Sequence, residues 1–122
     1  MSAEIVTDML TLRNQIKIYH WQTMHSPRHT ATDELVDKLD KNIDTFVEVY
    51  MGKYGRPNFK KTASIKIHNF HDKDGPAFLK SAVTWLSKSL PKSLDKQDTD
   101  LLNIRDEILA DLNQARYLFT LS

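Results

Sequence analysis

Cysteine is absent from the 122 residues of this chain, which excludes disulfide bridges, thiolate metal sites and cysteine nucleophiles. An excess of charge of one sign is also lacking, since 17 Lys and Arg residues balance 16 Asp and Glu residues and leave a formal net charge of +1. This balance does not create the global field that attracts nucleic acid. The sequence contains no Gly-rich phosphate loop and no nucleophile elbow. Histidine and the carboxylates therefore remain as the candidate functional groups.

Long hydrophobic runs are missing as well. No apolar run approaches the roughly 18 residues of a membrane span. The segment MSAEIVTDML has neither the basic start nor the apolar centre of a signal peptide. We therefore expect a soluble, cytoplasmic protein with no membrane partner. At this length, with 40% hydrophobic residues, we expect one domain, residues 1–122, around a single core.

Apolar residues recur at three- and four-residue steps in four segments, which is the spacing of amphipathic helices. The expected helices are Ala3–Met24, Pro27–Lys53, Pro76–Leu90 and a fourth from the capping residue Asp98 or Thr99 to Leu118. Ser26 is placed to cap the second helix, and Pro91 to stop the third. Residues 55–75 lack helical periodicity. The pattern predicts an all-α four-helix bundle with a longer loop between helices two and three.

The second expected helix carries one imidazole and five carboxylates along one side. At 100° per residue, these six side chains lie within an arc of about 100° that borders the apolar face of the helix. This acidic stripe consists of His29, Asp33, Asp37, Asp40, Asp44 and Glu48. Carboxylates four residues apart repel one another, so the stripe requires a counter-charge.

A metal ion is one candidate for this counter-charge, because imidazole and carboxylate without sulfur suit iron, manganese or zinc. Helical bundles with a dimetal site in the core use Glu-x-x-His pairs, and this chain has none. A site inside one subunit is therefore disfavoured, and a site shared between two subunits stays open. Taken alone, the stripe is also typical of a solvated helix face.

The spacing of these residues resembles the ferroxidase motif of the Dps family, the miniferritins. The matching residues are His20-Trp21, His29, Asp33, Asp44 and Glu48. The C-terminal segment DTDLLNIRDEILADLNQARYLF is similar to the last helix of that family in its Asp-Thr start, its Arg-Asp pair and its closing aromatic residue. The resemblance implies a ferritin-like four-helix bundle that holds iron between two subunits at a two-fold interface.

The resemblance also implies a role for each residue of the motif. His20 and His29 would bind iron from one subunit, and Asp44 and Glu48 from the other. Asp33 would support a histidine or bind iron directly.

Trp21 would act as the redox-active residue that donates an electron near the site. The gap between His20 and His29 is shorter than is usual in the family, which makes His25 an additional candidate ligand. The family's small helix is missing from residues 55–75. The lysine-rich N-terminal tail with which many members hold DNA is also missing, so we do not expect a nucleic-acid partner.

We therefore expect an iron-binding ferroxidase and iron-sequestering miniferritin that oxidises ferrous iron with peroxide or oxygen. Iron is the expected metal, with zinc or manganese as substitutes. The expected partner is a second copy of the chain, and the resemblance extends this to a dodecameric shell. The alternative is a metal-free ferritin-like bundle with a structural or protein-binding role in a larger assembly.

Overall fold

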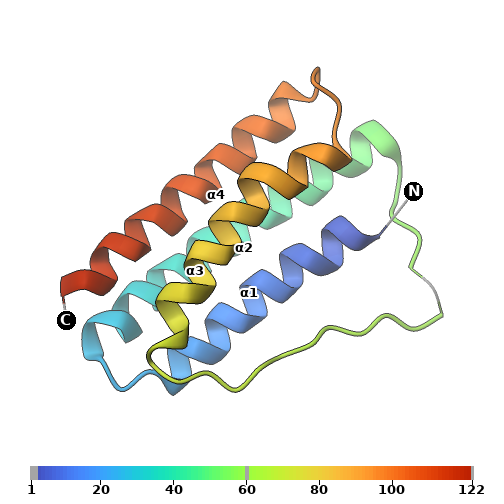
Figure 1. Cartoon of the computed structure of the whole chain (residues 1–122). Helices are drawn as coiled ribbons and strands as arrows, with labels where there is room; N and C mark the ends of the chain where they lie inside the picture. Colours follow the sequence, from blue (N-terminus) through green and yellow to red (C-terminus); the bar gives the residue numbers. More distant parts are fainter. Residues whose placement is uncertain (1–2, 60, 122) are drawn as a thin grey trace.

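The computed structural model describes residues 3–59 and 61–121 of the chain, and within them it contains four α-helices and no strand. The helices are α1 (Glu4–Gln22), α2 (Ser26–Tyr54), α3 (Asp74–Thr84) and α4 (Thr99–Leu118), and they pack side by side as a bundle (Figure 1). The predicted all-α class with four helices is confirmed. Among the described residues, no helix has the length and apolarity needed to cross a membrane.

The connection between α2 and α3 determines the topology of the bundle. A three-residue turn joins α1 to α2, so these helices run antiparallel, and α3 and α4 form a second antiparallel pair (Figure 1). The connection from 55 to 73, here called the crossover, passes along the length of the bundle beside α1 (Figure 1). As a result, α2 and α3 run in the same direction, and the two chain ends lie at opposite ends of the bundle.

The core is built from the apolar faces that the periodicity predicts. On α2, the six residues of the predicted apolar face are all buried: Leu35, Val36, Leu39, Ile43, Phe46 and Tyr50. Met9 of α1, Leu79 of α3 and Leu112 of α4 meet them in the same cluster. Because one side of α2 faces this core, the acidic stripe lies at its edge, on the outer surface of the α1 and α2 pair.

Several predicted helix ends differ from the structure. α1 ends at Gln22 instead of Met24, and α3 begins at Asp74 instead of Pro76. α2 begins at Ser26 instead of being capped by it, and no side chain of the described residues caps this end. Of the preceding N–H groups, that of Met24 donates to Asp72 in the crossover region, and that of His25 donates to the hydroxyl of Thr23 within the turn. The third helix does not continue as an α-helix to Leu90. A wider π-helical turn, Trp85–Ser89, follows α3, and a 3₁₀ turn, Leu90–Ser93, contains Pro91.

Asp98 stands at the N-terminal cap position of α4, but its carboxylate does not cap that helix. It accepts hydrogen bonds from Lys53 at 2.7 Å, from the hydroxyl of Tyr54, and from the N–H of Asp95 at 2.9 Å. These interactions, led by the one with Lys53, lower the pKa of Asp98 to about 2. The residue therefore connects the end of α2 to the start of α4.

Two glutamines of α1 hold the crossover against the bundle. The buried amide of Gln15 donates to the carbonyl of His68 at 2.9 Å and accepts from the N–H of His68 at 2.8 Å. The N–H of Phe70 donates to Gln22 at 2.7 Å. These side chains provide the hydrogen bonds that a neighbouring strand provides in a sheet, which satisfies backbone groups that helix packing leaves unpaired.

Candidate metal centre

His20 and His29 form a stacked pair where α1 meets α2. His20 lies in the last turn of α1, His29 lies in the first turn of α2, and the short turn between the helices brings the rings together. The ring centroids are 3.9 Å apart, and the planes are inclined by only 19°. The structure therefore brings together the two histidines of the predicted motif, here called the histidine pair.

Each ring of the histidine pair is oriented by the backbone of the other residue. Nδ1 of His20 donates to the carbonyl of His29 at 2.8 Å, and Nδ1 of His29 donates to the carbonyl of His20 at 2.8 Å. Because a carbonyl can only accept, both Nδ1 atoms carry a proton. In the neutral rings each Nε2 then keeps its lone pair, which is the arrangement found in metal-binding histidines.

The surroundings of His20 favour the neutral ring. Its side chain is buried, and burial lowers the pKa of His20 below its ordinary value. The hydrogen bond to the carbonyl of His29 opposes this shift, and electrostatic interactions with the His29 side chain and Lys17 add to it. The hydroxyl of Thr32 accepts from Nδ1 of His20 at 3.0 Å. A carboxylate oxygen of Asp33 lies 4.0 Å from Nε2 of the same ring. The carboxylate of Asp33 is thus next to the nitrogen that is free to bind.

Asp44 and Glu48, here called the carboxylate pair, lie away from the histidine pair within one chain. Both are exposed on α2. They follow Asp33 by 11 and 15 residues, which corresponds to about 16 and 22 Å along the helix axis. Within residues 3–59 and 61–121, no group of three or more His, Cys, Asp or Glu side chains is positioned to hold a metal ion together. The chain therefore carries two separate parts of the predicted ligand set.

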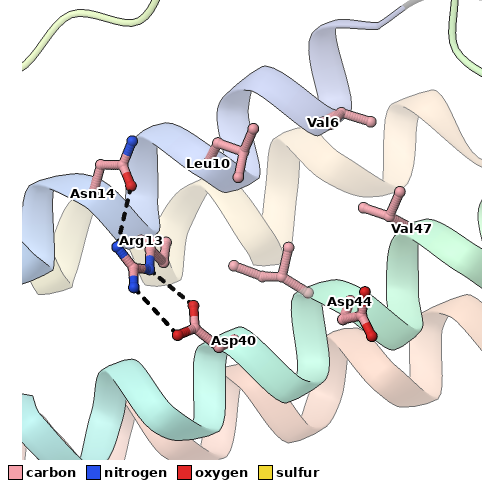
Figure 2. Close-up of a pocket in the computed structure, with 8 residues that line it drawn as sticks. Val6, Leu10, Arg13, Asn14, Asp40, Asp44 and Val47 are labelled. Atoms are coloured by element: carbon pink, nitrogen blue, oxygen red, sulfur yellow. Dashed lines mark hydrogen bonds and ion pairs between the residues drawn. The ribbon is translucent and has the colours of Figure 1, made fainter.

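Arg13 provides part of the counter-charge that the acidic stripe requires. It reaches from α1 to Asp40 on α2 with two hydrogen bonds, of 2.8 and 3.2 Å (Figure 2). Asp40 lies between the histidine pair and the carboxylate pair along α2. The centre of the stripe is thus neutralised by a side chain, whereas Asp44 and Glu48 are left for other partners.

An apolar groove lies beside Asp44, between α1 and α2 (Figure 2). Its volume is about 430 Å³. Its apolar lining comes from Val6, Leu10, Ile43 and Val47, and its polar lining from Arg13, Asn14, Asp40 and Asp44. Leu10 is 38% exposed there. The outer surface of the two helices, here called the α1–α2 face, therefore combines exposed apolar groups with carboxylates.

Trp21 and His25 occupy different surroundings. The ring of Trp21 is 64% exposed, and Nζ of Lys17 lies 5.1 Å from its centroid, within range of a cation–π interaction. His25 points toward the crossover, with its Nε2 3.7 Å from a carboxylate oxygen of Asp72. His20, and not His25, is therefore the partner of His29.

Sequence reasoning missed Thr32, Arg28 and Asp72, which surround the histidine pair. Thr32 follows His29 by three residues, and residues at this spacing on a helix are neighbours, so the sequence could have indicated its contact with the histidine pair. Asp72 is remote in sequence, and no local pattern connects it to the turn between α1 and α2.

The comparisons with known proteins give a family but no function. Residues 20–119 match the model described as a family of unknown function, DUF5856. No curated protein and no solved structure matches the chain. The matched region begins at His20 and includes both pairs of candidate ligands and the crossover.

Proposed function

This chain belongs to the DUF5856 family, whose function is unknown, and we propose that it is a ferritin-like, iron-binding ferroxidase that oxidises and sequesters ferrous iron. Two copies pair through their α1–α2 faces. The histidine pair and Asp33 of one copy then lie opposite the carboxylate pair of the other. The observation that carries this proposal is the reciprocal bonding of His20 and His29, which orients both rings and leaves both Nε2 atoms free.

The spacing of the ligands along α2 supports a two-fold arrangement. His29 and Asp33 are four residues apart, as are Asp44 and Glu48, so the pattern reads the same in both directions along the helix. In an isologous interface, if one residue of the first copy contacts a different residue of the second copy, the reverse contact also forms on the other side of the axis. An axis that passes between Asp37 and Asp40 therefore places each histidine pair across from a carboxylate pair, with Arg13 and Asp40 near the centre.

The stacking of the rings supports binding of two ions. An imidazole binds a metal in its own plane, and the two planes are nearly parallel and 3.9 Å apart at their centroids. Each ring would therefore hold an ion of its own through Nε2. Two ions with one imidazole each would suit a ferroxidase, because two ferrous ions supply the two electrons that, with two protons from solvent, reduce one molecule of hydrogen peroxide to two molecules of water.

The remaining residues have defined tasks in this proposal. Asp33, Asp44 and Glu48 neutralise the charge of the ions and supply oxygen ligands, which complement the imidazoles for a transition metal. Trp21 is next to His20 in sequence and is exposed, so it is placed to donate an electron from outside the site. The single long crossover, which makes α2 and α3 parallel, agrees with the topology of ferritin-like bundles.

Substitution of individual side chains tests the proposal. We expect that His29→Ala or Glu48→Ala abolishes rapid oxidation of ferrous iron. The rate of oxidation after addition of peroxide is measured by ultraviolet absorbance. Asp37→Asn removes a carboxylate from the same stripe outside the ligand set, so it is the matched control and should retain the rate within about twofold. Equal rates in the three variants would contradict the proposed site and would favour a metal-free structural bundle.

A further inference from the structure

Asp72, at the end of the crossover, binds the turn between α1 and α2 with its carboxylate. The hydroxyl of Thr23 and the N–H of Met24 both donate to this carboxylate, the latter at 3.1 Å. Nε2 of His25 lies 3.7 Å from a carboxylate oxygen of Asp72. One side chain therefore contacts all three residues of the turn that separates the two helices.

The backbone of Asp72 also reaches both sides of this turn. Its carbonyl accepts from the hydroxyl of Tyr19 at 3.1 Å and from the guanidinium of Arg28 at 2.9 Å. Arg28 in turn donates to the hydroxyl of Tyr19 at 3.0 Å. Tyr19 directly precedes His20, and Arg28 directly precedes His29. Asp72 therefore binds the neighbour of each histidine in the sequence.

We propose that Asp72 is a positioning residue for the histidine pair, which fixes the α1–α2 turn so that the Nδ1 atom of each histidine meets the carbonyl of the other. The two ring hydrogen bonds at 2.8 Å depend on the separation and relative twist of two backbone segments. Those segments belong to different helices, and the short turn between them does not by itself fix their relative position. The crossover does so from outside, through one carboxylate and one carbonyl.

The negative charge of the Asp72 carboxylate contributes to this positioning. The hydrogen bond from Thr23, followed by that from Met24, holds the pKa of Asp72 below its ordinary value, so the carboxylate is charged at neutral pH. A charged acceptor makes stronger hydrogen bonds than a neutral one. Loss of the charge therefore loosens the turn even where the overall helical bundle is retained.

The test measures the rings before it measures a metal. In the metal-free protein at neutral pH, nitrogen-edited proton NMR should give two slowly exchanging imidazole N–H signals, one from His20 and one from His29. We expect Asp72→Ala to accelerate the exchange of both protons at least about tenfold, because their carbonyl acceptors move. Thr23→Val removes one hydrogen bond to Asp72 and the acceptor of the N–H of His25, but Asp72 keeps its bond from the N–H of Met24, so the effect should be smaller and in the same direction.

Asp74→Asn is the matched control, because Asp74 lies two residues away and accepts from the N–H of His71 instead of from the turn. It should leave both ring signals unchanged. Unchanged signals in folded Asp72→Ala, or equal acceleration in Asp74→Asn, would overturn the assignment of Asp72. If Asp72→Ala does not fold, the same criteria apply to Thr23→Val.

Zinc affinity provides the second measurement, and this part rests on the proposed function. Calorimetry should show that Asp72→Ala weakens zinc binding roughly 10- to 100-fold, the range expected for residues that orient metal ligands. If the wild-type protein shows both ring signals but binds no zinc, the proposed metal function fails and the positioning role of Asp72 stands. If the wild-type protein lacks the ring signals, the positioning role fails.

Discussion

At the scale of single residues, the structure contains two carboxylates with similar tasks in different places. Asp72 holds the turn between α1 and α2, and Asp98 holds the end of α2 to the start of α4. Lys53, Tyr54 and the N–H of Asp95 all donate to Asp98. Both residues connect segments that are remote in sequence, and each fixes a helix end or a turn that the packing of the helices does not fix by itself.

The lowered pKa of Asp98 gives stability a defined dependence on pH. The ordinary pKa of an aspartate in an unfolded chain is about 3.9, and the folded value is about 2. The native state therefore gains stability from this group above about pH 4, and it loses that contribution as the pH falls toward 2. We expect Asp98→Asn to be less stable than wild type at pH 7 in urea unfolding, and to lose less between pH 4 and pH 2.

Asp100→Asn is the control for this prediction, because Asp100 also pairs with Lys53 at 2.7 Å but is exposed. Its unfolding midpoint at pH 7 should stay close to wild type. Parallel pH profiles for wild type and Asp98→Asn would show that the interactions of Asp98 do not contribute to the acid dependence.

At the scale of elements, two helical glycines differ in their surroundings. A Cβ on Gly75, near the start of α3, would lie 2.3 Å from the ring of Tyr19, whereas a Cβ on Gly52 of α2 meets nothing within 4 Å. α3 therefore packs closely on Tyr19, whose hydroxyl also binds the crossover. The glycine at position 75 allows this contact.

Alanine substitution should have opposite effects at these two glycines. Gly75→Ala forces Tyr19 out of its place and should destabilise the protein by about 1–3 kcal/mol. Gly52→Ala should stabilise it by about 0.5–1 kcal/mol, because alanine loses less conformational freedom in a helix. Chemical denaturation of both variants measures the difference. A Gly75→Ala variant as stable as wild type would mean that Tyr19 rearranges without cost.

The sequence predicts the helices well, because three- and four-residue periodicity reports directly on a buried face. The predicted apolar face of α2 is buried in full. The π-helical turn after α3 was not predictable. Arg105 of α4 donates a hydrogen bond to the carbonyl of Leu86 in this turn at 3.0 Å, and local sequence does not indicate such a contact. Local sequence also gives no indication that Gln15 would bind the backbone of His68.

The candidate site divides in the same way. Spacing singled out His20 and His29, and their fit to a known motif made them candidates before any geometry was known. Their reciprocal hydrogen bonds depend on the twist between two helices, which a residue pattern does not specify. The place of Asp72 depends on the path of the crossover. The assignment of Asp44 and Glu48 to a shared site remains a prediction.

At the scale of the whole molecule, the proposed function requires at least a dimer. The histidine pair and the carboxylate pair of one chain are too far apart along α2 to share an ion. Sedimentation at micromolar concentration should therefore show dimers or a larger closed assembly. Leu10→Glu introduces a charge into the groove of the α1–α2 face and should dissociate the dimer. Tyr117→Glu, on the exposed side of α4, should leave the dimer intact. A strictly monomeric wild-type protein would contradict the shared site.

Metal binding should also stabilise the assembly. A ligand that binds only the folded state at a hundredfold excess over its Kd adds about 2.7 kcal/mol. Zinc, or ferrous iron without oxygen, should raise the melting temperature by several degrees, whereas magnesium should do less because it does not favour imidazole. The double variant His20→Ala, His29→Ala should lose the selective shift. Equal effects of zinc and magnesium would indicate simple screening of the acidic stripe.

The path of the crossover also divides the chain into two fragments of equal architecture. Each fragment is a helical hairpin, α1 with α2 and α3 with α4, and the apolar residues of both hairpins form one shared core. Residues 61–64 are exposed, so a break there removes none of the hydrogen bonds that Gln15 and Gln22 make. Two separately expressed fragments, divided at this point, should be largely unfolded alone and should regain helical circular dichroism when mixed. The protein is thus suited to serve as a split reporter, in which reassembly of the halves also restores the turn that Asp72 holds.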